Sequence, residues 1–415
     1  MTDTNLFPED TLHFTGWEPA HDEAAARLAA FVPRAGKSYA KLRNFDFGPE
    51  KRSNISALSP WIRHRLLLEE TVLEAVLDRH RLAGAEKFIQ EVFWRGYFKG
   101  WLEQRPLVWQ SYKQNVVRLI DGLDKDAPLA RRYDEAISGR TGIDCFDAWT
   151  RELIGTGYLH NHARMWCASI WIYTLQLPWE LGADFFYRHL LDGDPASNTC
   201  SWRWVGGLHT IGKTYMARAS NIEKFTDGRF NPAGQLAADA PALPGGPLPE
   251  RTPIPFEDPK LQGQRVGLVI TEEDCSPHNL PLASRPVAAI ALDDFTPRST
   301  LASPEHVQSF ASKAVKAASE KFSKKTAIEV SGLCGQEWDV ALADWSGKNS
   351  IDVLVTTRLP RGPVRRRLLK AVKYLSAPLV EITRDYDRLT WPHAKAGFFG
   401  LKKKIPKILG DLKGL

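Results

Sequence analysis

The chain has 415 residues, of which 43% are hydrophobic and 25% charged, with a formal net charge of +6. This length supports two packed cores, and no window is apolar over the length of a bilayer, which excludes a membrane-spanning chain. With no export signal in its first residues, we expect a cytoplasmic monomer without a membrane partner. The modest basic excess permits binding to nucleic acid without requiring it.

Five cysteines lie far apart and form no C-x-x-C pair, so we expect neither a disulfide framework nor a zinc or iron–sulfur site. They are Cys145, Cys167, Cys200, Cys275 and Cys334. The 14 tryptophans are more unusual, because eleven of them lie between Trp17 and Trp204. Such a density indicates large buried cores, and it also supplies flat π faces for stacking on a planar ligand or a base.

The first half of the chain has the pattern of amphipathic helices. From Trp61 to Phe98, and again from Phe146 to Leu190, apolar residues recur at steps of three and four. After Asn231 the sequence becomes rich in Pro, Gly and Ala and loses its period, which indicates a linker. We therefore place a helical domain at residues 1–235 and the linker at residues 236–263.

The second half alternates predicted strands and helices, which implies a parallel sheet in a small Rossmann-like α/β domain at residues 264–395. The predicted strands are VGLVIT, VAAIAL, TAIEV, DVLVTT and PLVEIT, and the predicted helices are HVQSFASKAVKAASEKFSKK and GPVRRRLLKAVKYLS. No G-x-G-x-x-G follows a strand, so a standard dinucleotide site is not indicated there. Residues 396–415 form a basic amphipathic tail, a pattern more typical of a solvated terminal helix than of a membrane or DNA anchor.

Three segments of the first half combine polar and aromatic residues. FIQEVFWRGYF places Glu91, Trp94 and Arg95 on one helix face, and its flanking phenylalanines favour a partly buried cleft over a surface salt bridge. TGYLHNHARMW places Asn161, Arg164 and Met165 in the same spacing. His160 and His162 lie beside them, but no carboxylate stands at a metal-ligand spacing.

The third segment, LLDGDPASNTCSWRW, puts Asp192, Asp194 and Asn198 in a turn that leads into Trp202 and Trp204. A D-G-D triplet is ordinarily a turn or part of a calcium loop. Here no later glutamate completes a calcium pattern, and the aromatic pair indicates an organic ligand instead.

The order and spacing of these segments resemble the FAD-binding domain of DNA photolyases and cryptochromes from about Tyr39 to Pro232. SALSPW, EVFWRGYF, FDAWTRELIGTGYLHNHARM and LLDGDPASNTCSWRW resemble the family's phosphate-binding turn, its W-R helix, its H-N segment and its D-G-D loop. The resemblance implies an all-helical domain that binds FAD, followed here by the α/β domain. It does not specify a second, antenna chromophore.

Residues of the flavin site follow from the resemblance by position. It assigns the flavin phosphates to Tyr39, Arg43, Ser56, Leu58 and Ser59, near a helix start that suits an anion. It assigns the rest of the flavin to Arg95, Asn161, Arg164, Asp192, Asp194 and Asn198. Arg164 and Asp192 would form an ion pair at the N5 edge, and Asp194 would accept from N3–H. Asn198 would face N5, where a neutral amide suits a reduced flavin.

The resemblance also implies repair of cyclobutane pyrimidine dimers, by an electron from excited reduced flavin, in UV-damaged DNA. The residues that match the catalytic positions are Glu91, Asn161, Trp202 and Trp179, and those that match the substrate positions are Glu91, Trp94, Met165 and Trp204. Enzymes for 6-4 lesions carry histidines where Asn161 and Met165 stand, so the cyclobutane dimer is the expected substrate. The outermost tryptophan of the family's electron path has no clear match; Tyr112, Trp109 and Trp171 are alternatives.

The domain order departs from the family, whose members begin with an α/β antenna domain. VGLVITEEDCSPHNLP and GPVRRRLLKAVKYLSAPLVEITRDYDRLTWP resemble the opening and closing segments of that domain. This implies a circular permutation; the alternative is an unrelated α/β domain fused downstream. Three functions remain open: a deoxyribodipyrimidine photo-lyase, a cryptochrome-like blue-light photoreceptor acting through an unidentified signalling partner, and a flavoprotein that has lost both activities.

Overall fold

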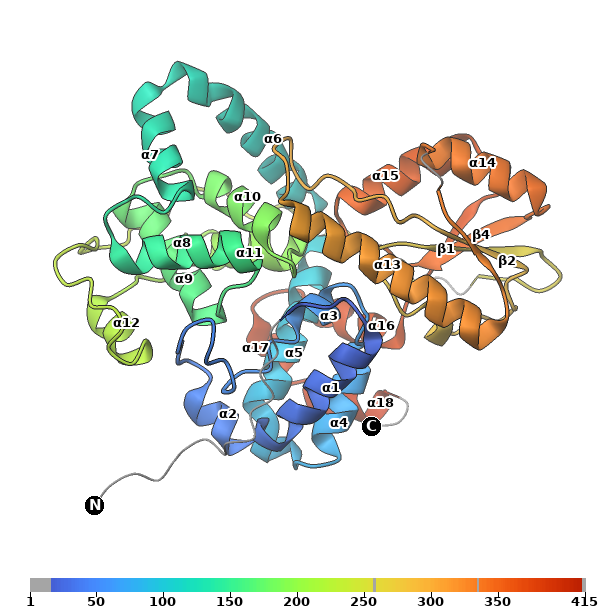
Figure 1. Cartoon of the computed structure of the whole chain (residues 1–415), viewed down its shortest axis with the longest axis horizontal. Coiled ribbons are helices and arrows are strands. Elements are labelled where there is room, and N and C mark those ends of the chain that lie inside the picture. Colours follow the sequence, from blue (N-terminus) through green and yellow to red (C-terminus); the bar gives the residue numbers. More distant parts are fainter. Residues whose placement is uncertain (1–15, 257–258, 334–335, 413–415) are drawn as a thin grey trace.

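The computed structural model describes residues 16–256, 259–333 and 336–412. A helical half and an α/β half pack against each other, and the last helices return to the helical half (Figure 1). This bears out the expected fold class of an all-helical unit followed by a small parallel-sheet unit.

The helical half is built around one long central helix, α5. Its helices are α1 (His21–Phe31), α2 (Lys37–Leu42), α3 (Ser59–Arg63), α4 (Glu69–Leu77), α5 (Leu82–Glu103), α6 (Pro106–Gly122), α7 (Ala127–Ile137), α8 (Asp144–Thr156), α9 (Asn161–Ser169), α10 (Trp179–His189), α11 (Pro195–Val205) and α12 (Ala219–Phe225). Helix α5 contacts α2, α4, α6 and α11 within this half. Its 22 residues contain no proline and bury an apolar face over their whole length, which sustains so long a helix.

The α/β half contains a five-stranded parallel sheet in the order β3-β2-β1-β4-β5. Its elements are β1 (Val266–Ile270), β2 (Ala288–Ala291), α13 (Glu305–Thr326), β3 (Val330–Ser331), α14 (Trp338–Lys348), β4 (Val353–Thr357), α15 (Pro363–Ala371) and β5 (Leu379–Ile382). The prediction of a parallel sheet is confirmed, and β1, at residues 266–270, is its central strand. A detached domain or an antiparallel sheet would have excluded permutation; the permuted antenna domain itself stays a prediction.

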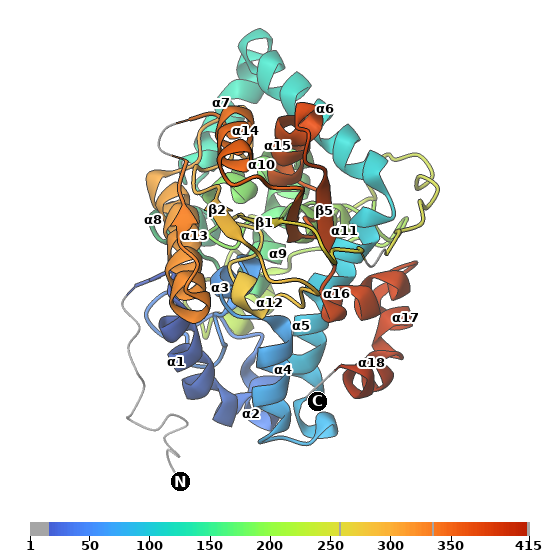
Figure 2. The same cartoon turned by 90° about the vertical axis from the view of Figure 1, so that its right-hand side faces the viewer.

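Helices cover both faces of this sheet, which explains why β1 and β4 are buried throughout. Alternate residues of β1 point to opposite sides: Leu268 packs in the same core as α13, whereas Val269 packs in the core formed with α14 and α15 (Figure 2). Helix α14 is absent from the elements predicted from the sequence. The spacing of its buried Trp338, Ala341 and Trp345 would have revealed it, because it follows a helical period.

Short turns of other helix types complete the chain. They are η1 (Val32–Arg34), η2 (Leu123–Lys125), η3 (Ile170–Thr174), η4 (Pro277–Asn279), η5 (Val372–Tyr374) and η6 (Trp391–His393), of which η3 is a π-helical turn. The predicted strand TAIEV yields only the two residues of β3, at the edge of the sheet.

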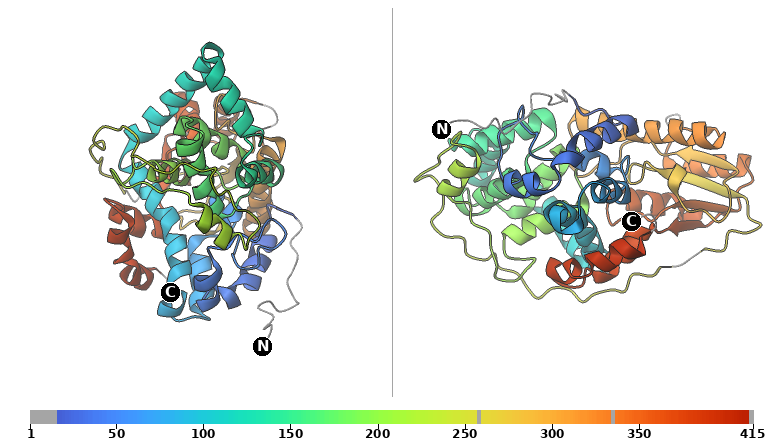
Figure 3. Two further views of the ribbon diagram at one scale, coloured as in Figure 1. Left: turned by 90° about the vertical axis from the view of Figure 1, so that its left-hand side faces the viewer. Right: turned by 90° about the horizontal axis from the view of Figure 1, so that it is seen from below.

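The linker crosses the surface of the helical half (Figure 3). Three backbone hydrogen bonds fix its path: Ala237 N–H donates to Thr174 Oγ1 at 3.0 Å, Leu243 N–H to Gly206 O at 3.0 Å, and Thr252 N–H to Gln104 O at 2.8 Å. The contact partners come from η3, the end of α11 and the end of α5, so the linker runs the length of this half.

The predicted basic tail is folded rather than solvated. It forms α17 (Phe398–Lys402) and α18 (Ile405–Asp411), which follow α16 (Asp385–Thr390), while residues 413–415 lie outside the described residues. Helices α16 and α17 and the turn η6 all contact α5. The approach is close because α5 has glycines here: a Cβ on Gly100 would lie 2.6 Å from Trp391 Cα.

The two halves meet at a buried polar junction, formed by residues 271–276 after β1 and by α3. The Arg63 guanidinium donates to both carboxylate oxygens of Glu273, at 2.7 and 2.8 Å. Cys275 N–H donates to His64 O at 2.8 Å, and Arg384 pairs with Asp274 through two bonds of 2.6 and 2.8 Å. The carboxyl end of the central strand is therefore enclosed by the helical half.

In the part of the chain that the structure describes, no helix is long and apolar enough to cross a membrane. No group of three potential metal-ligating side chains comes together among these residues either. Four of the five cysteines are described, and all four are free and buried; Cys334 falls outside the described residues.

Candidate functional site

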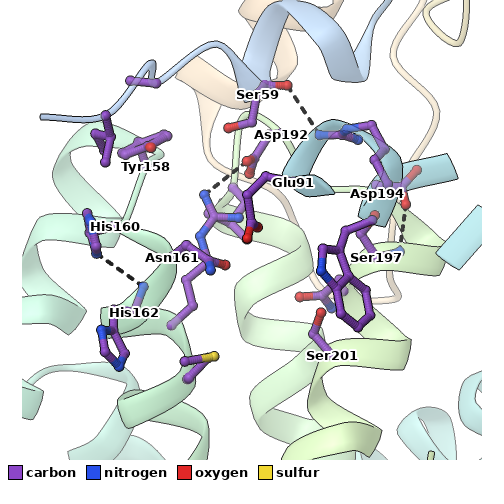
Figure 4. Close-up of a pocket in the computed structure, with 18 of the residues that line it drawn as sticks. Ser59, Glu91, Tyr158, His160, Asn161, His162, Asp192, Asp194, Ser197 and Ser201 are labelled. Atoms are coloured by element: carbon purple, nitrogen blue, oxygen red, sulfur yellow. Dashed lines mark hydrogen bonds and ion pairs between the residues drawn. The ribbon is translucent and has the colours of Figure 1, made fainter. Parts of the chain in front are cut away.

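A cavity of about 440 Å³ opens between α2, α3, α5, α9 and α11. It gathers nearly all the residues that the sequence assigns to the flavin and the substrate, from five separate segments (Figure 4). They are Tyr39, Arg43, Ser56, Leu58, Ser59, Glu91, Trp94, Arg95, Asn161, Arg164, Met165, Asp192, Asp194, Asn198, Trp202 and Trp204. The exception is Trp179, which lies on α10 outside the lining. The volume falls in the range of small-molecule and cofactor sites.

Asp194 is the N-cap residue of α11, and its carboxylate lines the cavity. One carboxylate oxygen caps the helix by accepting from Ser197 N–H at 2.6 Å. Burial opposes ionisation, but Lys99, Arg95 and Arg63 together lower the pKa of Asp194 to about 2. The other oxygen, Oδ2, is buried without a hydrogen-bond partner among the described residues. A ligand N–H would satisfy it, in keeping with the role that the sequence assigns to this residue.

Arg164 and Asp192 form the predicted ion pair. Arg164 Nη2 donates to Asp192 Oδ2 at 2.9 Å, and its Nε donates to Leu159 O at 2.9 Å, which orients the guanidinium from α9 toward the loop before α11. The Asp192 side chain is 3% exposed. Burial acts against its charge, but Arg164 outweighs burial and lowers the pKa of Asp192 below its ordinary value. The pair therefore stays ionised beside the cavity.

The loop between Asp192 and Asp194 is fixed in position by contacts with the junction. Arg63 Nε donates to Gly193 O at 2.8 Å, with the rest of its guanidinium engaged by Glu273 of the α/β half. Arg298, also from that half, donates to Leu190 O just before the loop. A Cβ on Gly193 would lie 2.3 Å from Arg298 Nη1, so only glycine fits at the centre of the loop. Both contacts tie the site to the α/β half.

Glu91 pairs with Arg43 across the cavity wall. Arg43, which is predicted to help hold the flavin phosphates, also lines the cavity, and its pairing with Glu91 leaves that prediction open. Burial raises the pKa of Glu91, although Arg43 acts in the opposite direction. The Glu91 carboxyl group lines the cavity, where it can form a hydrogen bond with a base or a flavin.

Asn198 presents an acceptor to the cavity. Its Nδ2 donates to Ala183 O at 2.7 Å, and because a carbonyl only accepts, the amide nitrogen must face that way. The side-chain oxygen is left to face the cavity that Asn198 lines. Such an oxygen can accept a hydrogen bond from a ligand N–H. The role predicted for Asn198 beside flavin N5 is therefore that of an acceptor.

Arg95 of α5 reaches the first residue of α3, Ser59. Arg95 Nη2 donates weakly to Ser59 O at 3.4 Å, and its Nη1 is buried without a hydrogen-bond partner. Ser197 Oγ is likewise buried without one. Together with Asp194 Oδ2, these orphaned polar atoms fit a polar ligand better than an empty core, because buried polar groups are normally satisfied. The residues present therefore fit FAD.

The histidines of the H-x-H pair act locally. His160 caps α9 by accepting from His162 N–H at 3.1 Å, and burial lowers the pKa of His160 to about 4. His162 contacts Asn44 O at 3.0 Å and stacks on Trp166 at 4.3 Å between ring centroids. Asn161, beside them, is exposed at the surface end of the cavity (Figure 4).

Trp94 has a neighbour that the sequence did not predict. Phe398 of α17 stacks on its ring, with centroids 3.8 Å apart and planes 11° apart. One face of Trp94 is thus covered by the protein, although Trp94 still lines the cavity. Among the described residues, none after Asn231 contributes to the lining, so neither the linker nor the tail fills the cavity.

The aromatic path behind the cavity is continuous from Trp179 outward. Trp179 stacks on Tyr112 at 5.5 Å, and Tyr112 lies 5.4 Å from Trp109, which is partly exposed. Trp202 lies on α11, beside α10, and its ring is 6.1 Å from that of Trp171. Tyr112 and Trp109 thus adjoin Trp179, whereas Trp171 adjoins Trp202.

Several lining residues, such as Tyr158, Ser197 and Ser201, were not predicted from the sequence. Neither were two residues that lie next to the site, Lys99 and Phe398. Lys99 is buried near Asp194, and its position one turn after Arg95 was a signal that could have identified it. Phe398 lies 304 positions from Trp94 in the sequence. No local sequence pattern could therefore have predicted that the two rings stack.

Residues 88–238 match the family model described as the FAD binding domain of DNA photolyase. A deoxyribodipyrimidine photo-lyase of Neurospora crassa is 28% identical over 55% of this chain and 38% of its own length. A cryptochrome DASH of Oryza sativa subsp. japonica is 28% identical over 48% of this chain and 34% of its own. A bacterial class III photolyase structure from Agrobacterium tumefaciens matches with a TM-score of 0.40 and 26% identity, covering 51% of this chain and 43% of that one.

The chain therefore spans roughly two fifths of the length of the first curated relatives. The predicted relationship to photolyases and cryptochromes is confirmed in the helical half, and so is FAD as the cofactor of this domain.

Proposed function

We propose that this chain, whose helical half is an FAD-binding domain of the photolyase/cryptochrome family, repairs cyclobutane pyrimidine dimers in DNA under blue light. One observation carries the proposal: the four predicted substrate residues line the same cavity as the predicted flavin residues. Bound FAD in its reduced form would supply the electron that splits the dimer when it absorbs light. The protein's own side chains would bind the dimer and orient it.

An extruded dimer would enter past Asn161 and the partly buried rings of Trp94 and Trp204. Stacking on an aromatic ring offsets part of the free energy lost when bases leave the duplex. Glu91 lines the same cavity and can form a hydrogen bond with a base of the dimer. Trp202 and Trp179 would carry electrons inward when the cofactor needs to be reduced, with Tyr112 as the next residue outward.

The photoreceptor function remains the second candidate, and Phe398 favours it. Because Phe398 covers one face of Trp94, only the other face and the edges are available to a base. If the stack excludes the dimer, the Phe398→Ala variant should bind damaged DNA more tightly than the unaltered chain. If Phe398 merely fixes the orientation of Trp94, the same variant should bind it less tightly.

The direct test measures the recovery of absorbance at the base band in UV-irradiated oligothymidine, with reduced FAD-loaded protein in light and in darkness. Glu91→Ala and Glu152→Ala form a matched pair, because both acids face an arginine and both have a pKa raised by burial. Only Glu91 lines the cavity. Repair should fall about tenfold or more in Glu91→Ala, the effect of one lost buried hydrogen bond, and hold in Glu152→Ala. Protein that binds FAD but restores no absorbance in light would contradict the proposal.

A further inference from the structure

The C-terminal segment from Trp391 to Leu412 includes most of the predicted tail at residues 396–415 and begins five residues before it, at η6. This longer segment, called the basic tail from here on, is rich in positive charge. It contains five lysines and one aspartate, so these 22 residues carry a formal charge of +4 out of +6 for the whole chain. Sequence pattern alone favours a solvated helix for such a stretch. Its position in the fold leads to a different conclusion.

The basic tail is fixed to the helical half by its apolar side. The side chains of Phe398, Leu401, Ile405, Ile408 and Leu409 are all buried in the core that contains α5. Backbone contacts add to this: Tyr97 Oη donates to Ala396 O at 2.6 Å, and Arg105 Nη2 donates to Lys395 O at 2.7 Å. The tail therefore presents a fixed polar side to solvent.

That side is a cluster of cations. Lys395, Lys403, Lys404 and Lys407 are exposed. Burial lowers the pKa of His393, and Lys404, Lys395 and Lys407 all lie close enough to His393 to lower it further. Lys407 also pairs with Asp411. Charges held together on a rigid surface attract a polyanion more strongly than the same charges on a mobile chain, because less ordering accompanies binding.

The cluster also adjoins the cavity. Phe398 stacks on Trp94, and Trp94 is one of the partly buried rings where the cavity reaches the surface. The next residue, Phe399, is 73% exposed. An exposed aromatic ring among lysines, beside an aromatic-lined cavity, is the combination that surfaces for single-stranded nucleic acid use.

We propose that the basic tail binds the phosphate backbone of a DNA strand beside the cavity, with Phe399 stacking on an unpaired base. The inference rests on the proposed function, because it names the surface that holds the strand whose dimer enters the cavity. A lipid surface fits less well, because binding to a bilayer requires an apolar helix face and that face is already buried against α5.

The test measures binding of fluorescently labelled oligothymidine, with and without cyclobutane dimers, to the FAD-loaded full chain at several salt concentrations. The triple variant Lys395→Gln/Lys403→Gln/Lys404→Gln should lower the slope of log K against log salt by about 2, since each lost phosphate contact on single strands removes about 0.7. Affinity should fall equally for damaged and undamaged strands. Phe399→Ala should weaken both by about tenfold.

The matched control is Lys316→Gln/Lys324→Gln/Lys325→Gln on α13, three exposed lysines on the opposite side of the molecule (Figures 2 and 3). This variant should leave the slope unchanged. An unchanged slope in the tail variant, or an equal loss in the control, would overturn the inference.

Two further outcomes separate this inference from the proposed function. If the tail lysines set the salt slope but the unaltered chain does not prefer dimers, the tail inference stands and dimer repair fails. If dimers are preferred and the tail variant changes nothing, repair stands and the tail inference fails. Binding through these lysines to phosphatidylserine vesicles but not to DNA would overturn it in favour of a membrane.

Discussion

The junction between the two halves and the cavity are both buried and both rich in charge, yet they are built differently. In the junction, two arginines each grip a carboxylate with two bonds: Arg63 holds Glu273 and Arg384 holds Asp274. In the cavity, one carboxylate oxygen of Asp194 accepts a hydrogen bond from its own helix, and the other has no partner among the described residues. Arg95 makes one weak hydrogen bond. The carboxylates of Glu273 and Asp274 are therefore satisfied by the protein, whereas Asp194 Oδ2 and Arg95 Nη1 in the cavity are left for a ligand.

This difference shows how to distinguish structural charges from binding charges. Open parallel sheets usually bind ligands beyond the carboxyl ends of their strands. Here the carboxyl end of β1 is occupied by Arg63, His64 and Arg65 from the helical half. The edge of the sheet where a ligand would usually bind is therefore part of the interface between the two halves. The candidate site lies instead in the helical half, where Asp194 Oδ2 and Arg95 Nη1 have no hydrogen-bond partner among the described residues.

The largest expected effect comes from Arg63→Ala. This change leaves Glu273 buried without its partner and removes the donor to Gly193, and a broken buried ion pair destabilises a protein by about 3–5 kcal/mol. Urea denaturation should show that loss, together with weaker FAD binding. Arg384→Ala should lower stability similarly but leave FAD affinity unchanged, because Arg384 does not touch the loop around Gly193. Equal losses of FAD affinity in both variants would show that the junction does not position the loop.

Arg164→Ala should act mainly on the cavity. It leaves Asp192 buried and unpaired, and a hydrogen bond to a charged group contributes about 1.5–3 kcal/mol. The dissociation constant for FAD should therefore rise by about 10- to 100-fold in a fluorescence titration. Stability of the protein without FAD should change less than in Arg63→Ala. FAD retention equal to that of the unaltered chain would mean that the pair does not face the flavin.

Acidification should destabilise the cavity through His160. Its folded pKa of about 4 lies below the ordinary value of 6.5, so the unfolded chain takes up a proton first and stability falls as pH decreases from 6.5 toward 4. Between about pH 7 and pH 5 this amounts to about 2 kcal/mol. His160→Asn preserves a capping acceptor and does not titrate, so urea denaturation at both pH values should show a shallower pH dependence. An identical dependence would mean that other groups dominate.

The smallest effect on stability should come from Trp179→Phe. This change removes part of a large aromatic ring and should lower the free energy of unfolding by about 1 kcal/mol. FAD binding should persist, because Trp179 lies outside the cavity lining. Photoreduction of bound FAD, monitored by its visible absorbance with an external thiol, should slow markedly. Tyr112→Phe should slow it as well, whereas Trp171→Phe should not if Tyr112 is the outer residue. The reverse order would assign the path to Trp171.

Local patterns in the sequence predicted the site well, because its parts are local. The spacing of Glu91, Trp94 and Arg95 is enough to place them on one helix face. Asp194 is followed by a proline at the first position of α11, a pattern typical of a helix start. Contacts between distant segments could not be read this way. The Arg43–Glu91 pair, the stack of Phe398 on Trp94 and the hold of Glu273 on Arg63 depend on tertiary packing across 48, 304 and 210 positions.

The central claim is that FAD completes the cavity around Asp194, whereas the protein itself satisfies the carboxylates of Glu273 and Asp274 in the junction. It is tested most directly by titrating flavin-free protein with FAD and comparing Asp194→Ala with Asp274→Asn, two buried aspartates whose pKa values are both lowered by neighbouring cations despite burial. We predict one FAD per chain for the unaltered protein and for Asp274→Asn, and a loss of binding of tenfold or more, about 1.4 kcal/mol, for Asp194→Ala. Equal FAD affinity in the two variants, or none in the unaltered chain, would contradict the account.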